Sequence, residues 1–249
     1  MDGHAFRQRT QPGYLAGRGL KRQAVMRPGP PDQRPVDIEK NYGRGRPLWV
    51  VTHDGETSLY DINYMEEFYG DRRVRVIKGD ITRIPADAIV NSASSDLAGG
   101  GGVDGAIHRA GGYQIAEDLE KIRATQARCS VGEAVATRAG DLPAKFVFHT
   151  VGPAYRDGAR GLDELLASCY ARCLQLAEQR GVRIISFPSI STGAFNYPLL
   201  EAADVAIETV VNYLVQHKGT VETVTFVLFD DPTLVAYESA LRRRRPGGS

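Results

Sequence analysis

Cysteine is scarce in this chain of 249 residues, which also has only three methionines and one tryptophan. The cysteines, Cys129, Cys169 and Cys173, are odd in number and provide no disulfide framework. Cys169 and Cys173 fall on one apolar helical stripe, so we expect both in the core. No histidine or cysteine pattern has the spacing of metal ligands, so the sequence predicts no metal site and no bound cofactor.

Long apolar runs are also absent. No segment approaches the roughly twenty apolar residues that a membrane-spanning helix needs. No hydrophobic stretch typical of a signal peptide is present near the N-terminus. We therefore expect a cytoplasmic protein that has no membrane contact.

Charge is unevenly distributed along the chain. Residues 1–46 carry ten basic and four acidic residues, and residues 242–245 are all arginine. The intervening residues 47–241 have 17 basic and 26 acidic residues, so this part has no overall attraction for nucleic acid. Residues 1–46 are rich in Gly, Pro and Arg and bury too little apolar surface to offset their ordering entropy, which predicts disorder. Weak nucleic-acid contact is therefore expected only from the basic tails.

Strand-like and helix-like patterns alternate from residue 73 onward. The expected strands span residues 74–78, 88–91, 134–137, 146–150, 184–188 and 221–229. The expected helices span residues 103–110, 113–124, 162–180, 199–216 and 232–241. This order predicts an α/β fold, a mixed central sheet with helices on both faces. We divide the chain into a disordered basic extension (1–46), a segment of open role (47–71), the α/β domain (72–241) and a basic tail (242–249).

Four consecutive glycines, residues 99–102, lie between an expected strand and an expected helix. Glycines lose much backbone entropy inside regular elements, but they suit a loop that turns its N–H groups toward an anion. The N-terminus of the following helix adds partial positive charge. Asp104 and His108 are four residues apart and share one face of that helix. The segment predicts a phosphate-containing ligand held beside a carboxylate.

The same glycines also fit the G-x-G-x-x-G pattern of dinucleotide-binding Rossmann domains, with Gly100, Gly102 and Gly105 in the three positions. In a Rossmann domain the first glycine follows its strand closely. Here seven polar-loop residues come between Asn91 and Gly99, and the acid expected further on would fall inside a predicted helix. This context favours a different kind of phosphate site.

The glycine run resembles the macrodomain family, in particular its MacroD-type branch. The resemblance extends through the motifs at residues 79–82, 149–153 and 191–198, and it covers about residues 73–241. It implies a three-layer α/β/α macrodomain. Macrodomains bind ADP-ribose and its derivatives, and MacroD-type members hydrolyse ADP-ribosyl esters.

The resemblance implies a role for several side chains. Asp80 corresponds to the acid that binds the exocyclic amine of adenine, with the backbone of Ile81 beside the ring; taken alone, Asp80 would be read as a turn cap. Phe229 corresponds to an adenine-stacking aromatic, with core packing an equal alternative. Asn91 corresponds to the asparagine that binds the distal ribose, and Asp104 to the acid that orients or activates water.

His108 is grouped with Asn91 and Asp104 as a catalytic residue, and we expect it to support this corner by hydrogen bonding rather than to transfer a proton. His149 is expected to be a satisfied core histidine. Phe195 corresponds to the aromatic beside the distal ribose. The ligand-binding positions implied in the two central loops are Ser94, Gly99, Gly100, Gly101, Gly102, Val103, Ser191, Thr192, Gly193, Ala194 and Phe195.

Three positions depart from the family pattern. Ser92 replaces the alanine after the first asparagine of the motif, Ser94 replaces the second asparagine, and Asn196 replaces a glycine before the Tyr-Pro pair. A lost hydrogen bond from the shorter Ser94 would cost about 0.5–1.5 kcal/mol, so we expect binding to persist. Asparagine tolerates positive φ better than most residues do.

We therefore expect hydrolysis of mono-ADP-ribose esters on Asp or Glu side chains, or of O-acetyl-ADP-ribose. The carboxylic acid released from an Asp or Glu ester has a pKa near 4, so it leaves as a carboxylate without an acid catalyst. The expected partners are ADP-ribose, its esters and mono-ADP-ribosylated proteins. A non-catalytic ADP-ribose reader and an ADP-ribose 1″-phosphate phosphatase remain as alternatives, and Ser94 favours the reader.

Overall fold

The structure is a computed structural model that describes residues 48–53, 56–61, 64–126 and 128–245. The disorder expected for residues 1–46, and residues 246–249 of the expected tail, lie outside this part of the chain. Strands β1 (Leu48–His53) and β2 (Glu56–Asp61) pair antiparallel in a two-stranded sheet of their own. The segment of open role therefore contains strands.

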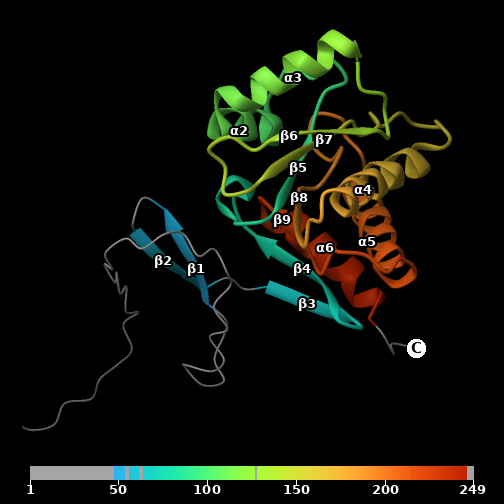
Figure 1. Ribbon diagram of the computed structural model, residues 1–249. Helices are drawn as coiled ribbons and strands as arrows, with labels where there is room; N and C mark the ends of the chain where they lie inside the picture. Colours follow the sequence, from blue (N-terminus) through green and yellow to red (C-terminus); the bar gives the residue numbers. More distant parts are fainter. Residues whose placement is uncertain (1–47, 54–55, 62–63, 127, 246–249) are drawn as a thin grey trace, which may run out of the picture.

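A seven-stranded mixed sheet forms the centre of the fold, in the order β3-β4-β9-β8-β5-β7-β6 (Figure 1). Its strands are β3 (Tyr64–Tyr69), β4 (Arg72–Lys78), β5 (Ala88–Ser92), β6 (Ala134–Arg138), β7 (Phe146–Thr150), β8 (Ile184–Phe187) and β9 (Thr223–Leu228). The five inner strands are parallel, and the edge strands β3 and β6 pair antiparallel with their neighbours. The chain therefore leaves all five inner strands at one edge of the sheet, where ligands of α/β proteins bind.

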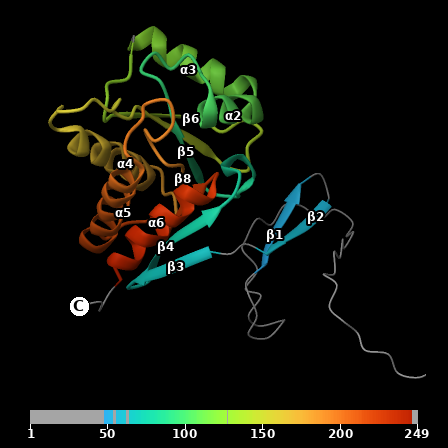
Figure 2. The same cartoon turned by 180° about the vertical axis from the view of Figure 1, so that it is seen from behind.

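Helices cover both faces of this sheet (Figures 1 and 2). They are α2 (Gly102–Gly111), α3 (Tyr113–Thr125), α4 (Leu162–Gln179), α5 (Leu199–Gln216) and α6 (Asp231–Arg243), with a short 3₁₀ helix η1 (Ile81–Arg83). The pair α2 and α3 packs on one face, and α4, α5 and α6 pack on the other. The expected three-layer α/β/α fold is confirmed. No helix in the described part of the chain is both long and apolar enough to cross a bilayer.

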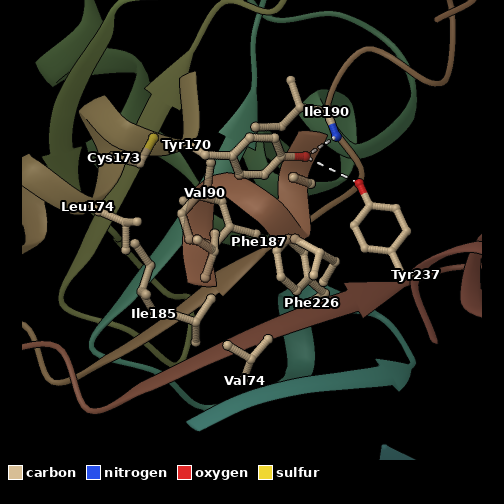
Figure 3. Close-up of a cluster of buried hydrophobic side chains, with 14 of the residues drawn as sticks. Val74, Val90, Tyr170, Cys173, Leu174, Ile185, Phe187, Ile190, Phe226 and Tyr237 are labelled. Atoms are coloured by element: carbon tan, nitrogen blue, oxygen red, sulfur yellow. Dashed lines mark hydrogen bonds between the residues drawn. The ribbon is translucent and has the colours of Figure 1, made fainter. Parts of the chain in front are cut away.

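Two hydrophobic cores lie on the two faces, because side chains alternate along each strand. In β5, Val90 points toward α4 and α5, whereas Ile89 points toward α2 and α3. Figure 3 shows the larger core, in which the fully buried Tyr170 hydroxyl contacts the Tyr237 hydroxyl at 3.2 Å. The expectation that Cys169 and Cys173 are core residues is confirmed, since both are fully buried.

The sheet and the last helix extend beyond the expected domain limits of 72 and 241. β3 pairs with β4 along its whole length and buries Met65, so the sheet begins before residue 72. α6 continues to Arg243. The arginines 242–245 pair with the acidic side chains of Glu238, Asp204, Glu208 and Glu67 respectively. The acidic domain thus neutralises this part of the basic tail.

Candidate functional site

The loop between β5 and α2 forms an anion-binding corner. α2 begins at Gly102, and no side chain caps its N-terminus. Among the described residues, no hydrogen bond satisfies the N–H groups of Gly99, Gly100 and Gly101. Residue 105 must be glycine, because the backbone of Gly100 lies so close that a Cβ atom on residue 105 would be 2.5 Å from the Gly100 carbonyl oxygen. The corner therefore presents several free N–H groups beside a positive helix end.

A buried amide–carboxylate pair lies directly behind these glycines. Asn91, near the end of β5, is fully buried, and its Nδ2 donates to Oδ1 of Asp104 at 2.6 Å. His108 Nε2 lies 3.3 Å from the same oxygen. Burial raises the pKa of Asp104, but the hydrogen bonds from His108 and Asn91 outweigh it and hold this pKa below its usual value. Asp104 is therefore an ionised, nearly buried carboxylate at neutral pH.

His149 on β7 contacts the other side of the Asn91 amide. Its Nδ1 lies 3.1 Å from Asn91 Nδ2, and its Nε2 lies 2.9 Å from Thr137 Oγ1 on β6. Burial, with a smaller contribution from His108, lowers the pKa of His149 to about 3, so the ring is neutral. The expectation of a satisfied core histidine is confirmed. Its link to Asn91 was not predicted, because it depends on the register of β5 and β7, in which Asn91 is the partner of His149.

The loop between β8 and α5 supplies a second set of free N–H groups. In the described chain, the N–H groups of Thr192, Gly193 and Ala194 have no hydrogen-bond partner. Ser191 has a positive φ of 66° and is nearly buried. Phe195 is half-buried, and its carbonyl oxygen accepts a hydrogen bond from Tyr155 N–H at 2.8 Å. β8 adjoins β5 in the sheet, so this loop and the glycine corner leave the same edge.

The backbone conformation of Asn196 explains why the family pattern has glycine at this position. Asn196 has a φ of 52°, in the left-handed region that glycine adopts most readily. Asparagine is one of the few other residues that enters this region routinely. The departure at Asn196 therefore preserves the turn into α5.

Asp80 and Phe229 follow the neighbouring strands β4 and β9. The backbone N–H and the hydroxyl of Thr82 both donate to Asp80 Oδ1, at 3.0 and 2.7 Å, so Asp80 does cap η1. Its other oxygen lies 3.5 Å from Arg83 Nε. Phe229 is 84% exposed, which rules out core packing. The side chain of Ile81, the residue after Asp80, is buried.

Ser94 is hydrogen-bonded to Asp96, a residue to which no role was given from the sequence. Its Oγ donates to Asp96 Oδ1 at 2.5 Å, and this carboxylate also accepts from Ala98 N–H. The hydrogen bond from Ser94 holds the pKa of Asp96 below its usual value. The Ser94 hydroxyl proton is therefore committed within the loop.

We also looked for binding or reactive sites elsewhere in the described part of the chain. A surface hollow of about 440 Å³ lies between α4 and α5, and none of its lining residues belongs to the expected site. In the described ranges, no group of three or more His, Cys, Asp or Glu side chains is arranged to hold a metal ion. The structure thus gathers the expected residues around the carboxyl edge of β4, β9, β8 and β5.

Comparisons with known proteins agree with this architecture. The Macro domain family model matches residues 90–206. The O-acetyl-ADP-ribose deacetylase of Escherichia fergusonii is 45% identical over 172 residues, which are 69% of this chain and 97% of that protein. The enzyme of the same name from Enterobacter cloacae is 48% identical over 172 residues, covering 69% and 95%.

A solved macrodomain of Oceanobacillus iheyensis with ADP superposes with a TM-score of 0.70 at 36% identity, covering 74% of this chain and 97% of that one. The relatives are thus matched over nearly their whole length, at identities well above those that indicate a shared fold alone. The chain belongs to the macrodomain family.

Proposed function

We propose that this protein binds ADP-ribose and hydrolyses ADP-ribosyl esters, namely O-acetyl-ADP-ribose and mono-ADP-ribose esters on Asp or Glu side chains. The observation that carries the proposal is the Asn91–Asp104 pair, buried directly behind the free N–H groups of the glycine corner. Burying an ionised carboxylate is costly unless hydrogen bonds compensate, and Asn91 and His108 supply these bonds to Asp104. The fold thus holds a negative charge ready beside the anion-binding corner. The names of the similar deacetylases point to the same chemistry.

The ligand would lie along the carboxyl edge of the sheet. Adenine would stack on the exposed Phe229 ring near Asp80, whose Oδ1 is held by Thr82. The two phosphates would accept hydrogen bonds from the free N–H groups of the two central loops. The distal ribose would then reach Asn91. The macrodomain of O. iheyensis, solved with ADP, supports a nucleotide in such a fold.

Asp104 would act on water above the distal ribose. Because its pKa is held low, Asp104 is ionised at neutral pH and accepts a hydrogen bond from the attacking water. Hydrolysis of either ester releases a carboxylic acid, which is acetic acid in one case and the protein side chain in the other. For the side-chain ester, a carboxylate leaving group departs without protonation, so one positioned base is sufficient.

The proposal also covers partners and location. Mono-ADP-ribosylated proteins are substrates if the ester carbonyl extends past Asp104 into solvent. Three buried, unpaired cysteines are typical of a reducing compartment, so we infer a cytoplasmic protein. Nucleic-acid contact would fall to residues 1–46, since the arginines 242–245 are paired within the domain.

The decisive experiment measures release of free ADP-ribose from O-acetyl-ADP-ribose and from a glutamate-ADP-ribosylated protein. Asp104→Asn removes the carboxylate while keeping its volume. Asp204→Asn is the matched control, because Asp204 lies on α5 and pairs with Arg243 on the surface. Hydrolysis by the wild type and the control, but not by Asp104→Asn, supports the enzyme. A wild type that binds ADP-ribose and releases none contradicts it.

The non-catalytic reader is a second candidate, and one observation favours it. The Ser94 hydroxyl donates to Asp96 and so has no proton left for the ribose. A missing ribose contact would leave binding largely intact, because the phosphates are held by backbone groups. Calorimetry with ADP-ribose, run beside the hydrolysis assay, separates a binder from an enzyme.

A further inference from the structure

A chain of hydrogen bonds links β6 to the candidate reaction centre. It consists of Thr137 on β6, His149 on β7, Asn91 on β5 and Asp104 on α2, joined by contacts of 2.9, 3.1 and 2.6 Å. Thr137 and Asn91 are 4% and 0% exposed, and His149 is fully buried. Thr137 lies in β6, outside every loop that is expected to touch the ligand. We call these four residues the buried hydrogen-bond chain.

The chemistry of the groups assigns every donor in this chain. Ionised Asp104 can only accept, so Asn91 must turn its NH₂ group toward it. The second hydrogen of the NH₂ group points to His149 Nδ1, which must then be the unprotonated nitrogen. His149 Nε2–H donates to Thr137 Oγ1, and the Thr137 hydroxyl donates to the Arg138 carbonyl oxygen. One tautomer of His149 and one orientation of the amide satisfy all these bonds.

This assignment leaves one polar atom without a partner. Both hydrogens of Asn91 Nδ2 are used, whereas Asn91 Oδ1 is buried and accepts no hydrogen bond from the described residues. A buried acceptor without a donor is unfavourable unless a ligand supplies one. A ribose hydroxyl is such a donor.

We propose that His149 and Thr137 are positioning residues, which fix the Asn91 amide so that its NH₂ group holds Asp104 and its Oδ1 accepts a hydrogen bond from a hydroxyl of the distal ribose. The placement of the ribose rests on the proposed function. The orientation of the amide does not, because it follows from contacts within the protein.

The buried hydrogen-bond chain also affects the ionisation of Asp104. His108 on α2 and His149 on β7 are the titratable groups that act on this carboxylate, and Asn91 is its other hydrogen-bond donor. If His149 loses its partner on β6, Asn91 is held less firmly and donates less to Asp104. The pKa of Asp104 then rises, and the acidic limb of the pH–rate profile moves toward neutral pH.

Thr137 offers a clean test because two substitutions separate its hydroxyl from its volume. Thr137→Val keeps the volume and removes the hydroxyl, whereas Thr137→Ser keeps the hydroxyl. Thr223→Val is the matched control, since Thr223 is equally buried in a strand but accepts its hydrogen bond from Arg73. All variants are made in the full chain and assayed for ADP-ribose release from O-acetyl-ADP-ribose, with ADP-ribose affinity by calorimetry.

We expect Thr137→Val to lower kcat by about three- to tenfold, the size of one hydrogen bond, and to move the acidic limb upward. Thr137→Ser and Thr223→Val should stay within about twofold of the wild type. ADP-ribose affinity should fall a few-fold in Thr137→Val alone. Equal kcat values and pH profiles for Thr137→Val and Thr137→Ser would overturn the proposal.

The tautomer of His149 gives a readout that needs no activity. In the ¹⁵N NMR spectrum of the wild type, His149 should be neutral, with its proton on Nε2, at every pH where the protein is folded. A proton on Nδ1 would overturn the proposal even if Thr137→Val failed to fold. A wild type without hydrolysis would refute the proposed function instead, and calorimetry and NMR would still decide the orientation of Asn91.

Discussion

The two ends of the candidate site are built differently. At the end proposed to bind the distal ribose, Asn91 is buried and hydrogen-bonded to both Asp104 and His149, which are buried as well. At the end proposed to bind adenine, Phe229 is 84% exposed and Asp80 is on the surface. Reaction chemistry needs groups held in one geometry before the substrate arrives, whereas an aromatic ring can stack on a base from an exposed position. The difference is what we expect if catalysis takes place at the buried end and recognition at the exposed end.

Removing the carboxylate at the buried end should have the largest effect. Asp104→Ala is expected to slow ester hydrolysis by about 10²–10⁴-fold, the usual contribution of a positioned base. ADP-ribose affinity should stay within about tenfold, because under the proposed function backbone N–H groups hold the phosphates. Steady-state kinetics and calorimetry test both numbers. A large loss of affinity with little loss of kcat would reverse the assignment of the two ends.

Phe229→Ala should have the opposite effect from Asp104→Ala, with a loss of ADP-ribose affinity and little change in turnover. Loss of base stacking is expected to weaken ADP-ribose binding by roughly 1–3 kcal/mol, which is about five- to 150-fold in Kd. Turnover at saturating substrate should change little, and so should the thermal midpoint, because the ring is exposed. Val215→Ala is the control, since Val215 is 65% exposed on α5. Unchanged affinity for ADP-ribose would remove Phe229 from the site.

Acid should inactivate the buried end only well below neutral pH. Because the folded-state pKa of Asp104 lies below its usual value, its carboxylate is ionised at neutral pH, and activity falls only as the pH drops through that lowered pKa. The contribution of Asp104 to folding stability is lost in the same direction. His108→Ala removes a hydrogen bond to Asp104 and should move the acidic limb of kcat toward neutral pH. An unmoved limb would show that His108 does not tune Asp104.

The smallest effect on turnover is expected from changes at Ser94 and at its hydrogen-bond partner Asp96. Ser94→Asn restores the amide usual in the family and should raise turnover by up to about tenfold if a ribose contact is missing. Asp96→Ala frees the Ser94 hydroxyl and should raise turnover by less. If both variants leave an active wild type unchanged, the Ser94–Asp96 contact has no part in catalysis.

Much of the fold could be predicted from local patterns. The predicted helix over 199–216 and the predicted strand over 146–150 coincide with α5 and β7. These segments have strong apolar periodicity, which specifies both the element and its buried face. Residues 64–69 were not assigned to a strand, because their two adjacent glutamates interrupt the apolar pattern. In the structure Glu66 and Glu67 are ion-paired with Arg75 and Arg245, and the exposed side chain of this edge strand is Phe68. The pairing of β3 with β4 is what orders it in the sheet.

The motif residues Asn91 and Asp104 could be named from the sequence, because their chemistry and spacing are local. Their own sequence determined the strand, the glycine loop and the helix that carry them, since backbone preferences act over a few residues. Tertiary structure alone decided that Thr137 and His149 orient Asn91, that Phe229 is exposed, and that the arginines 243–245 pair with acidic side chains. Each of these depends on contacts between residues far apart in the chain, and such contacts arise only when the sheet and its helices pack together.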